Sequence, residues 1–321
     1  MVLTDEPGIG ALRELGASGA PLTHAMLEKR VAAIAEVLGT PVKRARMLIS
    51  SVVVAQMLPE GIAVKGGVGI KLRLGETGTR ATSDVDIIAG DREGFFTRLR
   101  RGLEIGWGTV PPSKGAVKKD PAAPPRLAFN GKVRPDGQPR PAGVPPQYVM
   151  QPYSVTLQFM GKPWANVLLE VGHDEIGGLA HSSSPKQLAS QIEAMGEALG
   201  FGELRPVALI SLEQQITQKI HAATEPGSRR GHDLVDLQLL WNAGGDELDM
   251  PVLAEMCRRT FAFRQSHTWP PTAAMSAHVD AVYGEARQEA AVEEGPTVQL
   301  VETLGEACRW LNSRIAEIDA N

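Results

Sequence analysis

The chain has 321 residues, of which 43% are hydrophobic and 22% are charged, and its formal net charge is −4. This length suffices for one large or two ordinary domains, and the composition excludes a disordered or fibrous protein. The net charge lacks the overall basic character of many nucleic-acid-binding proteins, although a local basic patch is compatible with it. With only Cys257 and Cys308 present, a disulfide framework is excluded and a reducing compartment is expected.

Neither a membrane span nor a secretory leader is expected. No apolar run reaches the roughly 18 residues that a membrane-spanning helix needs. The first residues, MVLTDEPGIG, lack a basic segment followed by an apolar core. We therefore expect a cytoplasmic protein.

Hydrophobic periodicity predicts two helices near the start of the chain, over 23–38 and 42–57. A strand over 62–65, a short helix, a second strand ending at 88 and a helix over 91–103 follow. Strand patterns return between 148 and 171, and from 186 to 318 the spacing is helical with Pro and Gly breaks. The sequence therefore predicts an α/β domain over residues 1–181 and an all-α domain over 182–321, with SerSerSerPro at 182–185 as the boundary.

Residues 107–147 differ in composition from their surroundings. The segment is rich in proline and glycine and has more lysines and arginines than acids. Such a segment cannot build a core of its own, so we expect a basic insertion that forms an extended loop or hairpin over the functional site. The alternative is a variable insertion without function.

The most informative stretch is GIAVKGGVGIKLRLGETGTRATSDVDII, residues 61–88. Gly66 and Gly67 open a helix directly after a buried strand, and backbone N–H groups at a helix N-terminus bind phosphate. Asp84 and Asp86 are two apart on the next strand, so both carboxylates face one side and can share divalent cations. A phosphate site beside a metal site suits phosphoryl or nucleotidyl transfer.

A third acid, Glu170, lies in the mostly apolar strand ANVLLEVG. A buried carboxylate in such a strand is costly without a cation or a partner. Glu170 is therefore a candidate third metal ligand. The alternative is a residue at the sheet edge that faces solvent.

A second stretch, residues 211–241, is SLEQQITQKIHAATEPGSRRGHDLVDLQLLW. Ser211 and Gln214 form a capping box, and Lys219 lies on the polar side of the helix that follows. Asp233 and Asp236 share one face of the next helix. From residue type alone, Asp233 could simply complement the helix dipole as an acid in the first turn.

Together, the two stretches resemble the AbiEii/MenT family of nucleotidyltransferase-like toxins, in the DNA polymerase beta-like superfamily. The first family motif is a KGG stretch followed by R-x-S-x-D-x-D. The later motifs are E-x-x-x-x-K-x-x-A and R-x-K-D-x-x-D-L. The matching residues here are Lys65, Gly66, Gly67, Arg80, Thr82, Asp84 and Asp86, then Glu213 or Gln214, Lys219, Ala222, Arg230, His232, Asp233, Asp236 and Leu237.

The resemblance implies a nucleotidyltransferase domain with a mixed sheet, followed by a helical domain. It further implies a toxin of a type IV-like toxin–antitoxin or phage-defence system that moves NMP from an NTP to the 3′ end of tRNA and blocks translation. Mg²⁺ or Mn²⁺ would be the cofactor, and a cognate antitoxin would be a partner.

The resemblance also assigns roles to residues. Asp84, Asp86, Lys219 and Asp233 would be catalytic, Asp233 as an acid that positions or deprotonates the acceptor hydroxyl. The metal would be held by Asp84 and Asp86, with Glu170 as the third ligand that the strand pattern suggests. The nucleotide would be bound by Lys65, Gly66, Gly67, Arg80, Thr82, Arg230 and Asp236. Thr82 replaces the usual serine, and His232 replaces a lysine that would contact phosphate more strongly.

Two other functions remain open. Small-molecule nucleotidyltransferases, such as antibiotic-modifying enzymes, share the first motif but usually not the later one. A non-catalytic nucleotide-binding module would not need both Asp84 and Asp86. The P-loop, dinucleotide-binding and protein-kinase motifs are not present, and the histidines and cysteines have no zinc-site spacing.

Overall fold

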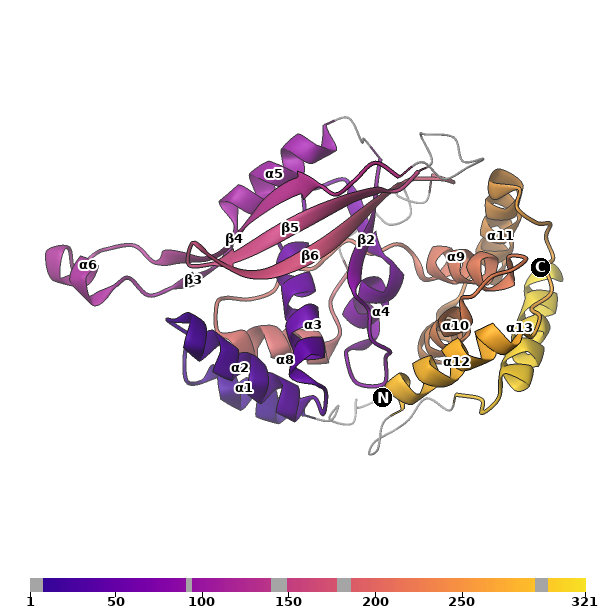
Figure 1. The fold of residues 1–321 in the computed structure, drawn as a ribbon, viewed down its shortest axis with the longest axis horizontal. Coiled ribbons are helices and arrows are strands. Elements are labelled where there is room, and N and C mark those ends of the chain that lie inside the picture. Colours follow the sequence, from indigo (N-terminus) through magenta and orange to yellow (C-terminus); the bar gives the residue numbers. More distant parts are fainter. Residues whose placement is uncertain (1–7, 91–93, 140–148, 178–185, 292–299) are drawn as a thin grey trace.

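The computed structural model describes residues 8–90, 94–139, 149–177, 186–291 and 300–321 (Figure 1). These residues form a curved sheet with helices packed on it and a separate group of helices beside it. Among the described helices, none has the length and apolar character that crossing a bilayer requires.

A six-stranded mixed sheet forms the centre of the first part, in the order β1-β2-β6-β5-β4-β3. The strands are β1 (Ile62–Lys65), β2 (Asp84–Ala89), β3 (Trp107–Val110), β4 (Arg126–Pro135), β5 (Gln151–Phe159) and β6 (Lys162–His173). The β2–β6 pair is parallel, and the other pairs are antiparallel. The mixed sheet expected from the sequence is confirmed.

One hydrophobic core joins this sheet to the helices around it. These helices are α1 (Ile9–Gly16), α2 (His24–Val37), α3 (Val42–Ala55), α4 (Gly66–Leu74), α5 (Phe95–Ile105) and α8 (Ser190–Leu199). The apolar stripes predicted for α2 and α3 are the faces that they bury, with Leu27, Ile34 and Ile49 fully enclosed. This packing supports the sheet from which β2 and β6 present their acids.

A second core lies among helices α9 (Leu212–Thr224), α10 (Gly231–Gly244), α11 (Met250–Arg264), α12 (Ala277–Ala290) and α13 (Leu304–Asp319), with the short 3₁₀ helix η2 (Gly245–Glu247). Ile70 of α4 packs into this second core, whereas Val68 and Leu72 of the same helix pack into the first. Helix α4 therefore links the two parts and fixes α9 and α10 next to β2.

The residues around the expected domain boundary at 181–182 lie outside the described part of the chain. Helix α8 follows that boundary, yet its buried residues Ile192, Met195 and Leu199 belong to the first core. The main chain of Glu197 in α8 comes so close to Gly16 of α1 that a side chain at Gly16 would overlap it. By packing, the change from the first core to the second falls near Ile210.

The Pro-rich segment 107–147 contributes two antiparallel strands to the sheet. Its described part forms β3, the short helix α6 (Lys114–Lys119) and β4, and Phe129 of β4 lies fully buried in the core. Figure 1 shows α6 at the far end of the sheet from α4, so the β3–α6–β4 part of the segment extends away from α4. Residues 140–147 lie outside the described residues.

Candidate active site

Three carboxylates converge on one face of the sheet. Val85 and Ile87 of β2 are fully buried, so the alternation of the strand turns Asp84 and Asp86 to the opposite face. In the parallel register between β2 and β6, Asp86 lies opposite Glu170. One oxygen from each of Asp84, Asp86 and Glu170 lies within 4.8 Å of the other two. This geometry can hold a hard divalent cation, which prefers oxygen ligands.

The electrostatics of the acid cluster also favour a cation. Burial raises the pKa of Asp86, and the neighbouring charge of Asp84 raises it further, against the opposing effect of Lys65. Burial likewise raises the pKa of Glu170, with Asp86 and Asp84 adding to the increase. The three acids therefore repel one another at neutral pH, and a bound divalent cation would relieve that repulsion.

The two glycines at the start of α4 make room for cleft side chains. Gly66 has a left-handed φ of 64°, and a Cβ there would overlap the Oδ2 atom of Asp86. A Cβ at Gly67 would overlap the side chain of Thr82. The glycine pair thus brings the N-terminus of α4 against Asp86 and Thr82, and phosphate groups would meet its N–H groups there.

Lys65, which ends β1, pairs across the antiparallel ladder with Asp86. Burial lowers the pKa of Lys65, while Asp86, Glu175 and Glu170 act in the opposite direction. Lys65 does not line the large cleft beside these acids. A Cβ at Gly172 would lie 3.4 Å from the Nζ atom of Lys65. The structure places this predicted nucleotide ligand as a counter-charge to the acid cluster.

The later motif folds into a buried network of charges that joins α9 and α10 to the residues before β2. Nζ of Lys219 donates to Asp233 at 2.5 Å and to Asp236 at 2.6 Å. Arg80 donates to both oxygens of Asp236, at 2.9 and 2.8 Å. Nε of Arg230 donates to the second oxygen of Asp233 at 2.6 Å. Both aspartates are fully enclosed, so each depends on these cations.

This network fixes the charge of its members. Burial alone would raise the pKa of Asp233, but Lys219 and Arg230 outweigh it and lower the pKa to about 2. The pKa of Asp236 is lowered in the same way by Lys219 and Arg80. Lys219 is deeply buried, yet Asp233 and Asp236 raise its pKa. Asp233 is therefore a poor proton acceptor and is suited to holding the two cations in place.

A cleft of about 1250 Å³ is lined both by acids of the metal cluster and by cations of the buried charge network. The sequence-predicted residues that line it are Gly66, Gly67, Arg80, Thr82, Asp84, Asp86, Lys219, Arg230 and His232. The Arg230 side chain is 52% exposed despite its pairing with Asp233. Asp84 and Asp86 form an acidic wall of this cleft, and Arg80, Lys219 and Arg230 form a cationic wall.

His232 occupies the position where the family motif has lysine. It lines the cleft, and its Nε2 atom lies 3.5 Å from an oxygen of Asp233. Burial lowers the pKa of His232, and Asp233 opposes this shift. The imidazole is therefore mainly neutral at pH 7, and Lys219 and Arg230 provide the positive charge on this side.

The sequence motifs do not identify all residues of the cleft. Lys43 and Arg44 of α3 line it, as does Glu289 of α12. Arg44 is anchored by a salt bridge with the buried Glu76 and by the carbonyl of Thr79. The only local signal is a basic run at the start of α3, which does not reveal that this helix end reaches the cleft.

A family model matches most of the chain. The model of the family described as nucleotidyl transferase AbiEii toxin, type IV TA system, matches residues 51–304. The chain belongs to the AbiEii family. The match includes both motif stretches, so the resemblance is confirmed and the AbiEii chain is a nucleotidyltransferase of a toxin family.

Solved structures similar to this AbiEii protein have low sequence identity. One is MenT4, a nucleotidyltransferase toxin from Mycobacterium tuberculosis H37Rv, at 16% identity with a TM-score of 0.47, covering 94% of this chain and 99% of that one. Another is a protein from H. pylori assigned as a nucleotidyltransferase, at 12% identity with a TM-score of 0.38, covering 86% and 93%. No curated protein matches the sequence.

Proposed function

We propose that this AbiEii nucleotidyltransferase is a metal-dependent toxin that transfers NMP from an NTP to the 3′ end of tRNA. The observation that carries the chemistry is the convergence of Asp84, Asp86 and Glu170 beside the N-terminus of α4. Mg²⁺ or Mn²⁺ is the proposed cofactor, because three carboxylates form an all-oxygen ligand set. When bound, the cation would neutralise charge on the triphosphate and align the attacking oxygen.

In this reaction, the acceptor 3′ oxygen forms a bond to the α-phosphorus of the NTP. The bond to the pyrophosphate oxygen breaks, pyrophosphate leaves, and the proton of the hydroxyl is released to solvent. Gly66 and Gly67 place the N-terminus of α4 where a phosphate would sit, and Thr82 adds a hydroxyl next to Gly67. These groups bind and orient the NTP without undergoing covalent change.

The cationic wall would stabilise the charge that develops on the leaving pyrophosphate. Lys219 and Arg230 line the cleft and are kept charged by Asp233, which is buried behind them. Asp233 itself would act as a positioning residue, which differs from its sequence-based role as an acid at the acceptor hydroxyl. Asp236, which binds both Lys219 and Arg80, would hold Lys219 in place from its other side.

The size of the cleft supports a large acceptor. A volume of about 1250 Å³ exceeds the roughly 300–1,000 Å³ of ordinary small-molecule pockets, so an NTP leaves room for the end of a polymer. tRNA is proposed as that polymer from the family resemblance, and its modification would stop translation in the cytoplasm. A cognate antitoxin is the proposed partner that restrains this activity.

The test is incubation of the purified protein with total tRNA, magnesium and each labelled NTP in turn. We expect label on the tRNA with the wild type and none with Asp84→Ala. Asp246→Ala, an exposed acid on η2, serves as the matched control and should label like the wild type. If no RNA is labelled with any NTP, the tRNA proposal is wrong. Label on an added small molecule instead would favour the antibiotic-modifying type of acceptor.

A further inference from the structure

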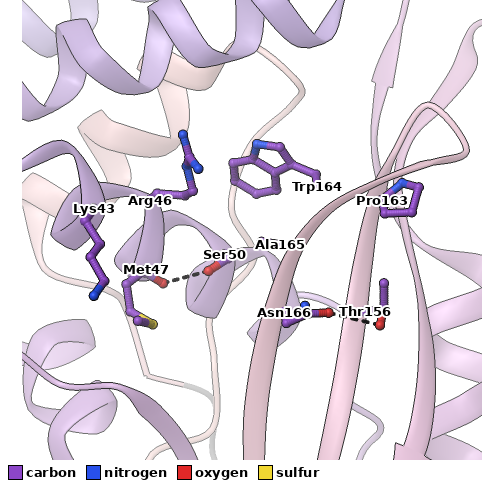
Figure 2. Close-up of a pocket in the computed structure, with 9 residues that line it drawn as sticks. All are labelled: Lys43, Arg46, Met47, Ser50, Thr156, Pro163, Trp164, Ala165 and Asn166. Carbon is purple, nitrogen blue, oxygen red and sulfur yellow. Dashed lines mark hydrogen bonds between the residues drawn. The ribbon is translucent and has the colours of Figure 1, made fainter.

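A second pocket of about 350 Å³ opens between α3 and the β5–β6 hairpin (Figure 2). We call it the side pocket and define it by Lys43, Arg46 and Met47 of α3 with Thr156, Trp164 and Asn166 of the hairpin. The family match begins at residue 51, so the α3 residues that line the side pocket lie outside the matched region. The side pocket is therefore not part of the motif-bearing site.

The side pocket adjoins the active-site cleft. Lys43 and Met47 line both, so the two spaces meet along the first turns of α3. Strand β6 gives a second connection, because Asn166, Leu168 and Glu170 alternate with buried residues and face the same side. Four residues of strand span about 13 Å, which is a distance that a few nucleotides can bridge.

Strand β6 exposes an edge at the side pocket. Strand β2 pairs only with residues 168–173 of β6, whereas β5 pairs with residues between 162 and 171. The residues before Leu168 therefore have no β2 neighbour, and Pro163, Trp164, Ala165 and Asn166 follow one another along the pocket wall.

Trp164 is held in a fixed orientation at this edge. Its Nε1 atom donates to Glu28 at 2.8 Å, and its ring contacts Phe129 with centroids 5.5 Å apart. Glu28 also pairs with Arg46, so the negative charge behind the indole is neutralised. Trp164 is half-buried and lines the pocket. An aromatic ring fixed in this way is a stacking surface for a nucleobase.

The charge of the pocket fits a phosphate backbone. Lys43 is exposed and makes no ion pair with any residue that the structure describes. It stands where the side pocket opens into the cleft, so its ammonium group can contact a phosphate that passes between them. Asn166 accepts a hydrogen bond from Thr156 at 3.0 Å and offers a polar group to a base edge.

We propose that the side pocket binds an unpaired nucleotide of the acceptor strand, with its base stacked on Trp164 and its phosphate contacted by Lys43. This inference rests on the proposed function, because it assumes that the acceptor is a nucleic acid with a single-stranded 3′ end. It adds that the enzyme reads the strand upstream of the reacting nucleotide. A small-molecule acceptor would not use this pocket.

The test measures both binding and transfer with a six-nucleotide RNA that has a free 3′ hydroxyl and a 5′ fluorophore. We expect Trp164→Leu and Lys43→Glu each to raise the Kd by about tenfold, since losing a stacked base or a phosphate contact has an effect of this order. Trp164→Phe should bind nearly as the wild type, because it keeps an aromatic face. Lys118→Glu makes the same charge change on α6 and should have no effect.

The KM values separate the side pocket from the NTP site. In transfer assays, Trp164→Leu should raise the KM for the RNA and leave the KM for the NTP unchanged. Lys43→Glu is a surface change and keeps the test valid if Trp164→Leu fails to fold. Unchanged RNA binding in folded Lys43→Glu and Trp164→Leu would overturn the inference.

The outcomes also distinguish this inference from the proposed function. Transfer to RNA that does not depend on Trp164 or Lys43 would overturn the inference and leave the function standing. Binding that depends on both residues, without transfer to any RNA, would support the pocket and overturn the function. A wild type that does not bind the six-nucleotide RNA and labels neither it nor total tRNA would overturn both.

Discussion

Asp236 of α10 holds Arg80 through two hydrogen bonds of 2.9 and 2.8 Å, although 156 residues separate them in the sequence. Arg80 lies just before β2, so this pair ties the helical part of the chain to the strand that bears Asp84 and Asp86. The same Asp236 also accepts from Lys219. One buried carboxylate therefore fixes the acidic and cationic walls relative to each other.

The first prediction concerns this carboxylate. Asp236→Asn removes the negative charge and leaves Arg80 and Lys219 without their shared partner in a buried site. We expect the free energy of unfolding to fall by about 3 kcal/mol, the range for breaking a buried ion pair. Urea denaturation measures this change. Asp246→Asn on η2 is the exposed control, and an equally small loss in both variants would contradict the structural role.

The second prediction is a pH dependence. The pKa of Asp233 is about 2 in the folded protein, below its ordinary value of 3.8. A lowered pKa in the folded state stabilises the protein above about pH 4, and this stabilisation is lost as the pH falls toward 2. The lost contribution is about 2 kcal/mol.

Asp233→Asn isolates this contribution. The difference in free energy of unfolding between wild type and variant should be largest at pH 5 and should shrink between pH 4 and pH 2. Chemical denaturation at a series of pH values checks it. A difference that stays constant over this range would mean that the Asp233 pKa is not lowered by folding.

The local geometry of the acid pair could be predicted because it is encoded in contiguous residues. The alternation of Asp84, Val85 and Asp86 decides which side chains face out, and Gly66 marks the start of α4. Ser211 likewise marks the start of α9, where its side chain accepts a hydrogen bond from the Gln214 N–H. The other half of the predicted capping box is not formed, because Oε1 of Gln214 has no hydrogen-bond partner among the described residues. These features depend on periods of two and 3.6 residues rather than on distant contacts.

Other features depend on tertiary packing and were missed or misplaced. The composition of 107–147 predicts a loop or hairpin but not that β4 joins the central sheet, because its pairing with β5 rather than local propensity determines that. Lys43 reaches the cleft only because α3 packs on the sheet. The sequence also does not predict that Lys219 of α9 and Arg230 of the preceding loop both bind Asp233.

The third prediction concerns the metal. Glu170→Gln removes one of three converging charges and should weaken Mn²⁺ binding by roughly tenfold, since affinity follows ligand charge. Because burial and mutual repulsion raise the pKa values of Asp86 and Glu170, protons compete with the metal, and wild-type affinity should fall as the pH is lowered. Calorimetric titration with Mn²⁺ measures both effects. Glu60→Gln, an exposed acid before β1, is the control, and equal affinities in the two variants would remove Glu170 from the site.

The fourth prediction separates backbone strain from displacement of a metal ligand. Gly66 and Gly61 both have left-handed φ values, 64° and 77°, so alanine at either should cost about 1 kcal/mol of stability. A Cβ at Gly61 meets nothing within 4 Å, whereas one at Gly66 would overlap the carboxylate of Asp86. We therefore expect Gly66→Ala to lose Mn²⁺ affinity and nucleotidyl transfer, while Gly61→Ala keeps both. Thermal denaturation and metal titration of the two variants measure the two effects separately. If Gly66→Ala binds Mn²⁺ as tightly as Gly61→Ala does, then Gly66 does not position Asp86, and its role is confined to the phosphate side of the site.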